Sequence, residues 1–401
     1  MNLWNDYKKI PLPKVLSFIV DNRGKTVPTA KDGNHKLIAT NCIRNENLYP
    51  SYEKIRLLSE DTYQTWFRAH PIPGDIIFVC KGTPGRTCMV PDPIDFCIAQ
   101  DMIAFRVDEK QIYNRYLLVV LRSREIQEQI ANTSVGDVIP HFKKQFLDQL
   151  LIPLPPMDIQ KKIGDLYFAM ALKEELNKRI NKNLEQQAQS IYEEFLSNHQ
   201  TFPVTIGDIV LMANTGADAI QKAPIVDYDT GIRCVRVGDL SNQRPVYEWG
   251  FTKVTPEIFK RYQLHKDDIV VTRTASLGLN QLIGEDLNAV YNNGLIRISI
   301  NDDIVYPLIV YRQFQTKDYR NYISRITGET SVRPNMKINY LLKYKFEILE
   351  KAEQTELVHI IQPLFEAQER NTSENLLLSS LRDALLPKLM SGELDVSNLD
   401  L

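Results

Sequence analysis

The sequence predicts a mixed α/β protein that is built twice, with two globular α/β domains separated by two long antiparallel coiled-coil helices in a pseudo-twofold internal repeat. Three observations predict this fold class. A segment that ends at Gln160 returns as one that ends at Gln354, about 194 residues later in a chain of 401. From these glutamines the two copies continue in register without a gap. Each copy starts with short β-like stretches and ends with a long helix-forming segment.

Each domain follows the same order of turn, strand, second turn, longer β stretch, helix and loop. In the first copy, the strand is predicted at 76–80, the β stretch at 97–107 and the helix at 113–131. In the second copy, these elements are predicted at 269–272, 289–300 and 306–326.

Each tail is predicted to be one long amphipathic helix. Residues 157–198 contain no proline and one glycine, and 42 helical residues would span roughly 63 Å. The partner segment, 351–392, contains Pro363, which predicts a kink or a restart. Because each helix leads away from its own domain, an antiparallel pair is the simplest packing; ordinary core helices remain the alternative. The predicted stripes are Ile163, Leu166, Met170, Ile180, Leu184, Ile191 and Phe195, and Leu357, Ile360, Leu364, Leu377, Leu381, Leu385 and Leu389.

The composition is that of a folded protein, because 43% of the residues are hydrophobic. Five cysteines without a CxxC pair predict reduced thiols, and no apolar segment is long enough to cross a bilayer. We therefore expect a soluble, cytoplasmic protein without membrane contact. The net charge of −2 divides into two mildly basic domains and an acidic last segment, 351–401. Such a weak basic field implies that partners would supply much of the positive charge if the protein binds DNA.

Two segments resemble the specificity subunits of Type I restriction-modification systems. They are 152–156 (IPLPP), which is followed by Gln160 and a long helix, and 381–394 (LRDALLPKLMSGEL). The duplicated plan also fits that family, and the chain departs from it at 346–350, where FEILE replaces the proline-rich linker. The resemblance implies a first target recognition domain at 1–156, a central helical region at 157–198, a second target recognition domain at 199–350 and a distal helical region at 351–401.

The same resemblance implies the partners. Each domain would read one half of a split site in double-stranded DNA, and the helices would separate the domains and hold two methyltransferase subunits. Such a subunit performs no chemistry itself, so no cofactor is expected in this chain. AdoMet is expected in the methyltransferase subunits, and ATP and Mg²⁺ are expected with restriction subunits if these are present.

We expect DNA contacts at three places in each domain. The turns at 81–87 and 273–280 combine cations, hydroxyls and glycine, which suit phosphates and guanine edges; the alternative is a surface hairpin that is basic by chance. Two strand ends could read bases, or could be buried strands with solvated polar ends. The loops before the linkers suit phosphate contact. The predicted contacts are Lys81, Thr83, Arg86 and Thr87, Arg273, Thr274, Ser276 and Asn280, Asn41, Arg44 and Arg236, and Lys143, Arg333 and Lys337.

Methyltransferase docking is expected on the apolar ends of the two helices, although a role within the chain is the alternative. The docking residues predicted are Tyr192, Phe195, Leu196, Leu386, Leu389 and Met390.

Sequence motifs for catalysis are weak. The sequence contains no GxxxxGK[ST] loop, no HExxH helix and no Asn/Asp-Pro-Pro-aromatic tetrapeptide. Asp92 and Asp108-Glu109-Lys110 imitate a metal-dependent nuclease, but the second copy has no counterpart of the lysine. We expect no catalytic, cofactor-binding or metal-binding residues. The rival hypotheses are a two-headed scaffold without a role on DNA and a stand-alone nuclease.

Overall fold

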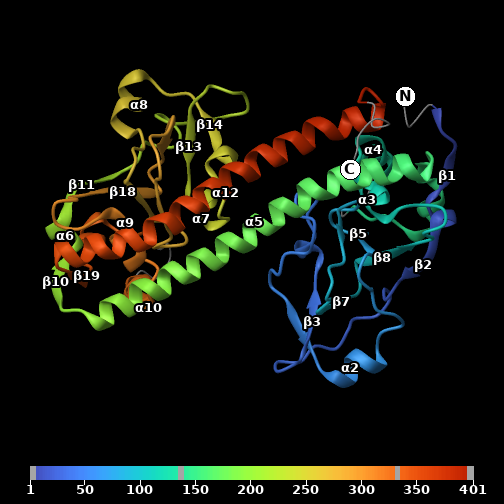
Figure 1. Cartoon of the computed structure of the whole chain (residues 1–401), viewed down its shortest axis with the longest axis horizontal. Coiled ribbons are helices and arrows are strands. Elements are labelled where there is room, and N and C mark those ends of the chain that lie inside the picture. Colours follow the sequence, from blue (N-terminus) through green and yellow to red (C-terminus); the bar gives the residue numbers. More distant parts are fainter. Residues whose placement is uncertain (1–5, 134–139, 330–334, 395–401) are drawn as a thin grey trace. The chain divides into compact units, whose positions relative to one another are not determined.

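A computed structural model of the chain describes residues 6–133, 140–329 and 335–394 (Figure 1). The chain divides into two compact units. Unit 1 contains residues 1–177 and 374–401, and unit 2 contains residues 178–373. Each unit therefore contains one α/β domain and one half of each long helix. The predicted fold class is confirmed, while the four-part division of the chain stays a prediction.

Unit 1 is built on two small sheets and one strand pair. One sheet has the order β2-β8-β5-β6 and is antiparallel; the other has the order β4-β3-β7, with β3 and β7 parallel. Strand β1 pairs with β9, which ties the start of the domain to its end. The elements are β1 (Lys9–Pro11), η1 (Leu12–Val15), β2 (Leu16–Val20), β3 (His35–Ile38), η2 (Thr40–Cys42), β4 (Arg56–Leu58), α2 (Glu60–Thr65), β5 (Ile76–Val79), β6 (Thr87–Met89), β7 (Phe96–Ile98), β8 (Met102–Val107), α3 (Asn114–Arg122), α4 (Arg124–Thr133), η3 (Lys144–Gln149) and β9 (Leu151–Pro153).

Unit 2 repeats this topology with one more strand, β12, at the edge of its second sheet. Its sheets have the orders β11-β18-β15-β16 and β12-β14-β13-β17, again with one parallel pair, β13 and β17, and β10 pairs with β19. The elements are β10 (Thr201–Thr205), α6 (Ile206–Ile209), β11 (Val210–Thr215), β12 (Ile225–Val226), β13 (Arg233–Val235), α7 (Val237–Ser241), η4 (Val246–Glu248), β14 (Gly250–Thr252), α8 (Pro256–Tyr262), β15 (Ile269–Thr272), β16 (Asn280–Leu282), β17 (Ala289–Tyr291), β18 (Leu295–Ile300), α9 (Pro307–Gln313), α10 (Lys317–Glu329), α11 (Ile338–Leu342) and β19 (Lys345–Leu349).

The two glutamines that mark the repeat, Gln160 and Gln354, make the same hydrogen bonds in both units. Gln160 is buried; its side-chain amide donates to the carbonyl of Pro155 at 2.9 Å, and its oxygen accepts from the backbone N–H of Tyr113 at 2.9 Å. Gln354 makes the corresponding bonds, to the carbonyl of Leu349 at 2.9 Å and from the N–H of Tyr306 at 3.3 Å. Each glutamine thus ties the start of a long helix to its linker and to the residue before the domain's helix. The predicted repeat is confirmed.

Two details of the predicted elements are wrong. Each long β stretch is two strands, β7 and β8 or β17 and β18, and each predicted domain helix is two helices, α3 and α4 or α9 and α10. The helices divide at Ser123 and Thr316. The hydroxyl oxygen of Thr316 accepts a hydrogen bond from the N–H of Tyr319 at 3.2 Å, and Ser123 makes the same contact with Ile126 at 3.5 Å. A hydroxyl that caps a new first turn ends the preceding helix.

The long helices have the predicted extents, α5 at Met157–Asn198 and α12 at Lys351–Ser391. The predicted restart at Pro363 is wrong, because α12 is continuous there. An interior proline costs about 3 kcal/mol. Burial of Leu357, Ile361 and Phe365 in the core of unit 2 offsets that cost. No helix in the described ranges combines the length and apolar character that a membrane span requires.

Within each unit the two helix halves are antiparallel, as predicted. In unit 1, Asn177 donates to Asn375 at 2.9 Å, and three residues earlier on α5 Glu174 pairs with Arg382 at 3.1 Å. In unit 2, Asn181 donates to Thr372 at 3.3 Å, and further along α5 Glu185 accepts from Gln368 at 3.2 Å. In both units, therefore, one residue number rises as the other falls.

The predicted apolar stripe is only partly buried. Ile180, Ile360, Leu377 and Leu381 are exposed by 46, 43, 59 and 43%. The buried positions near the middle of the helices are instead polar; they are Glu174, Asn177, Asn375 and Arg382. Hydrogen bonds and an ion pair hold this part of the helix pair, so apolar periodicity alone assigns its inner face wrongly.

Candidate nucleic-acid interface

The two turns that were predicted to contact DNA occupy equivalent places. In unit 1 the turn joins β5 to β6, and the N–H of Gly85 donates to the carbonyl of Val79 at 3.0 Å. In unit 2 the turn joins β15 to β16, and the N–H of Gly278 donates to the carbonyl of Thr272 at 2.9 Å. Both members of the second pair lie 193 positions after those of the first. One backbone design therefore presents two different sets of side chains.

The glycines within these turns serve packing as well as conformation. Gly278 has φ +78°, and a Cβ atom there would lie 2.6 Å from Cγ1 of Ile323 on α10. Gly85 has φ +92°, and its Cβ would lie 2.9 Å from Oε1 of Gln127 on α4. Gly82 has φ +83° and no heavy atom within 4 Å of that position. Among these three glycines, Gly82 alone has open space where a side chain would stand.

In unit 1 three of the four predicted side chains are accessible. Lys81, Thr83 and Arg86 are exposed. Thr87 is completely buried, and its hydroxyl accepts a hydrogen bond from Nε of Arg122 at 3.2 Å. The side chain of Thr87 is therefore not accessible to DNA in this conformation, because β6 turns it into the domain.

In unit 2 the cations do not match those of unit 1. Arg273 occupies the place of Cys80, and its guanidinium donates to the carbonyls of Met336 at 3.2 Å and Asn293 at 3.3 Å. The places of Lys81 and Arg86 are taken by Thr274 and Leu279. Ser276 is exposed, whereas Asn280 donates to the carbonyl of Gly278 at 3.1 Å. The second turn therefore offers hydroxyls and amides where the first offers ammonium and guanidinium groups.

The loops before the linkers are tied to these turns. The N–H of Phe142 donates to the carbonyl of Cys80 at 2.7 Å, and the N–H of Met336 donates to the carbonyl of Arg273 at 2.8 Å. The next residues, Lys143 and Lys337, are exposed. In each unit, the turn and the loop before the linker thus form one continuous surface. The sequence predicted them as two separate surfaces. Arg333 lies outside the described residues.

The predicted strand-end contacts have partners within the chain. Asn41 donates to the carbonyl of Glu53 at 2.8 Å, and Arg44 pairs with the carboxylate of Glu53 at 2.6 Å. Nε of Arg236 lies 3.4 Å from the carboxylate of Asp239 at the start of α7. These contacts favour the structural alternative, in which the polar ends of a strand support the adjoining helical turn.

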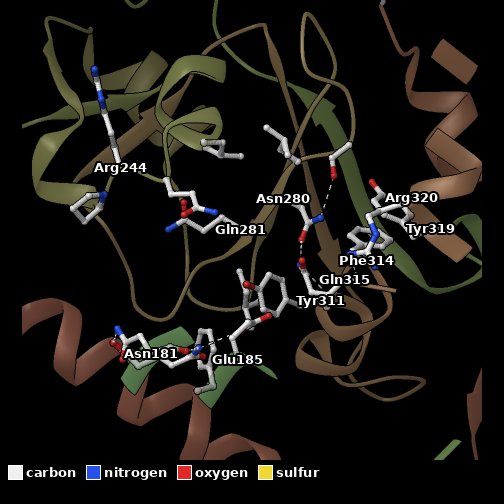
Figure 2. Close-up of a pocket in the computed structure, with 18 of the residues that line it drawn as sticks. Asn181, Glu185, Arg244, Asn280, Gln281, Tyr311, Phe314, Gln315, Tyr319 and Arg320 are labelled. Carbon is white, nitrogen blue, oxygen red and sulfur yellow. Dashed lines mark hydrogen bonds between the residues drawn. The ribbon is translucent and has the colours of Figure 1, made fainter. Parts of the chain in front are cut away.

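A cavity of about 750 Å³ adjoins the turn in unit 2 (Figure 2). Figure 2 shows Asn280 accepting a hydrogen bond from Gln315, at 2.7 Å, on one side of it. In unit 1 the positions of Asn280 and Gln315 are held by Thr87 and Arg122. Arg122 is long enough to reach Oη of Tyr167 on α5, at 3.0 Å. Gln315 is shorter than Arg122, so unit 2 has a cavity where the side chain of Arg122 fills the corresponding space in unit 1.

Sequence reasoning missed a basic pocket in unit 1. Its volume is about 310 Å³, and it lies beside the turn that contains Lys81. The segment Arg23-Gly24-Lys25, a glycine between two cations, is the sequence signal that could have identified it. The pocket is lined by Arg23, Gly24, Lys25, Thr26, Lys81, Gln100, Asp101 and His141.

The predicted docking residues face the cores of the two units. Tyr192 is fully buried, and its hydroxyl donates to Oε1 of Gln313 at 2.7 Å. Leu389 and Met390 are buried in the core of unit 1. The role within the chain, which was the alternative, accounts for these three. The remaining residues pack partly buried against a core; they are Phe195, Leu196 and Leu386.

The nuclease-like segment has an ordinary structural role. The carboxylate of Asp108 accepts from Nε2 of Gln111 at 2.8 Å and from the N–H of Lys110 at 3.2 Å. These hydrogen bonds, with that of Gln111 first, lower the pKa of Asp108. Among the described residues, no group of three or more histidine, cysteine or acidic side chains could hold a metal ion.

Comparison with known proteins defines the class of these domains. The family model of the Type I restriction modification DNA specificity domain matches residues 20–186, which include strands β3 to β9 and the β5–β6 turn of unit 1. The MjaIX specificity subunit, a Type I restriction enzyme subunit of Methanocaldococcus jannaschii, is 23% identical over 325 residues, which are 72% of this chain and 71% of the relative. The EcoBI specificity subunit of Escherichia coli is 22% identical over 356 residues, which are 80% and 74%.

A solved structure shows the same fold. The Type-I restriction-modification system S subunit from M. genitalium matches with a TM-score of 0.57 at 15% identity, covering 96% of each chain. In sequence and in fold, the chain is therefore similar to the specificity subunits of Type I restriction-modification systems.

Proposed function

We propose that this chain is the DNA-recognition subunit of a Type I restriction-modification enzyme, in which each unit reads one half of a bipartite target. The observation that carries the proposal is the repeated turn. Its backbone hydrogen bonds are the same in both units, while Lys81 and Arg86 are replaced by Thr274 and Leu279. A common frame with different donors and acceptors is what two readers of different half-sites require.

The chemistry is assigned to the partners. Two methyltransferase subunits with AdoMet would methylate an adenine in each half-site, and restriction subunits with ATP and Mg²⁺ would cleave. The chain itself is proposed to be non-catalytic. Purified chain should therefore show no methyl transfer from AdoMet to target DNA until methyltransferase subunits are added. Turnover by the chain alone would contradict this assignment.

Exchange of one domain tests the reading role. Replacement of residues 1–156 by the corresponding domain of another specificity subunit should change one half of the methylated sequence and leave the other half unchanged. Sequencing of methylated adenines across the genome measures both halves together. A change in both halves would contradict the proposal of two independent readers, and an unchanged target would remove unit 1 from recognition. A two-headed scaffold without a role on DNA predicts no target at all.

The spacing role rests on the two helices. Removal of equal numbers of helical turns from α5 and α12 should shorten the gap between the methylated half-sites, since one turn of DNA is about 34 Å. An unchanged gap would show that the helices do not set it.

The exposed leucines of α12 support a revised docking surface. Leu376, Leu377 and Leu381 are exposed by 37, 59 and 43%, in place of the buried Leu389 and Met390. Single apolar side chains on a surface are common, but neighbouring ones indicate a partner. L377E with L381E should weaken methyltransferase assembly in pull-down titration while leaving the fold intact by circular dichroism. Unchanged assembly would exclude this face.

A further inference from the structure

The basic pocket of unit 1 is formed by two segments that lie far apart in the sequence. Residues 22–26 follow strand β2, and Lys81 and His141 form an isolated backbone bridge beside them. Arg23 is fixed, because its guanidinium makes a two-point pair with the carboxylate of Asp21, at 2.9 Å for each bond. The positive charge of this residue is therefore held at the pocket in one orientation.

The two lysines of the pocket are free to bind. Lys25 and Lys81 are both exposed, and within the described parts of the chain neither ammonium group has a hydrogen-bond or ion-pair partner. Two carboxylates lie near. Asp21 is balanced by Arg23 and by Lys144 at 3.8 Å, and Asp101 lines the pocket. Four cations face two carboxylates, so the site has an excess of positive charge even when His141 is left out of the count.

Unit 2 has the same backbone at this place but different chemistry. Thr274 and Asn335 form the isolated bridge that Lys81 and His141 form in unit 1. The strand pairs Val20–Ala104 and Asn214–Arg297 place Ala217 and Ala219 where unit 1 has Arg23 and Lys25. The neighbouring Asp218 accepts a hydrogen bond from Asn293 at 3.4 Å. All of the pocket's free cations are thus absent from the corresponding described residues of unit 2.

We propose that the pocket lined by Arg23, Lys25, Lys81 and His141 binds one backbone phosphate of the DNA half-site that unit 1 reads, and that unit 2 makes no such contact. The inference rests on the proposed function. Lysines are flexible point charges, which suit a phosphate better than the edge of a base. In the same turn, the N–H of Gly82 donates to the carbonyl of Pro140 at 3.0 Å, which joins Lys81 to the loop that carries His141.

The two half-sites should then differ in their dependence on salt. Each neutralised phosphate contributes about −0.9 to the slope of log K against log salt concentration. The K25A/K81A double variant, assembled with its methyltransferase subunits, should lose about one unit of slope on target DNA. Across a fourfold rise in salt concentration, the ratio of the natural complex's affinity to that of the K25A/K81A complex should fall by about threefold.

A modified DNA locates the contact. A single neutral methylphosphonate, placed in turn at each position of the first half-site, should reproduce the slope loss at one position only. At that position, the slope lost by combining the methylphosphonate with K25A/K81A should equal the slope lost by either change alone. K110A is the matched control, because Lys110 is exposed in the same unit but does not line the pocket; it should keep the natural slope. The K25R/K81R variant should keep it as well.

The reverse experiment introduces the two lysines at the corresponding positions of unit 2. A219K with T274K should add up to one unit of slope. If the natural complex does not bind the target, the proposed function fails. If it binds and K25A/K81A keeps the natural slope, only the phosphate pocket is overturned. A variant that changes base preference without a change of slope overturns it too, because the lysines would then read a base. Retained methylation of the second half-site shows that the variant is folded.

Discussion

Arg122 is the residue whose replacement tests the architecture of unit 1 most directly. It ends α3, is 7% exposed, and joins three parts of the unit. Its guanidinium donates to the carbonyls of Thr87 and Asn47, both at 2.7 Å, and to the hydroxyl of Tyr167 at 3.0 Å. The turn, the loop after β3 and helix α5 therefore depend on one side chain. Replacement by methionine keeps the stem of the side chain and removes every donor.

The magnitude follows from the acceptors that are left. Each buried acceptor that loses a charged donor costs about 1 to 3 kcal/mol, and relaxation or water recovers part of that cost. Four acceptors on three residues lose their donor, including the Thr87 hydroxyl at 3.2 Å. We therefore expect R122M to lower the free energy of opening of the β5–β6 hairpin by about 3 kcal/mol. Gln315 holds the same place in unit 2, beside a cavity; its amide donates to Asn280 at 2.7 Å and to the carbonyl of Tyr311 at a longer 3.4 Å. Q315M should cost about 1 kcal/mol.

Native-state hydrogen exchange measures both hairpins in one experiment, so a two-state assumption for the whole chain is not needed. R122M should increase exchange in the peptides of β5 and β6 and leave those of β15 and β16 unchanged; Q315M should do the opposite, weakly. In the assembled enzyme, R122M should reduce methylation of the first half-site selectively. Equal effects of R122M in both units, or a smaller effect of R122M than of Q315M, would refute the reasoning.

Two further substitutions test the turn and the helix pair. G278A should destabilise unit 2 by about 2 to 4 kcal/mol, because a side chain at φ +78° is strained and would also collide with Ile323. G82A should cost about 1 kcal/mol, because it adds the same strain without a collision. Urea unfolding compares the two variants, and equal losses of stability would exclude the collision as the cause. R382M should cost about 3 kcal/mol in unit 1, because it removes the guanidinium that pairs with the buried carboxylate of Glu174 at 3.1 Å. Unchanged thermal unfolding would show that this ion pair does not stabilise the unit.

The repeat and the long helices could be predicted because their signals are local. Helix formers without breakers give the extents of α5, and turn residues mark β5 and β15. The inner face of the helices could not be predicted, since it depends on partners such as Asn177 and Asn375, about 200 positions apart. A stripe of leucines is the expected signal for burial, and here polar pairs replace it.

The candidate site was predicted in place but not in detail. The sequence places the turns at 81–87 and 273–280 in equivalent positions, which would match Lys81 with Arg273, whereas the backbone hydrogen bonds align Arg273 with Cys80. Thr87 looked accessible because its partner, Arg122, comes 35 positions later in the sequence. Neither the alignment of the two turns nor the burial of Thr87 can be recognised from the neighbouring residues in the sequence. The pocket around Lys25 was missed for the same reason, because strand pairing brings its two segments together.

The distribution of hydrogen bonds explains how one frame can serve two targets. The bonds that fix the turns and join them to the loops before the linkers run from backbone to backbone, as from Phe142 to Cys80 and from Met336 to Arg273. Such bonds are insensitive to the side chains involved. The turn can therefore exchange lysine for threonine, or arginine for leucine, without a change in its geometry. Gln160 and Gln354, whose side chains tie each long helix to its linker, are identical in the two units. Recognition can then change by substitution at the turns alone, provided that the glycines and the buried partners of the turns are retained.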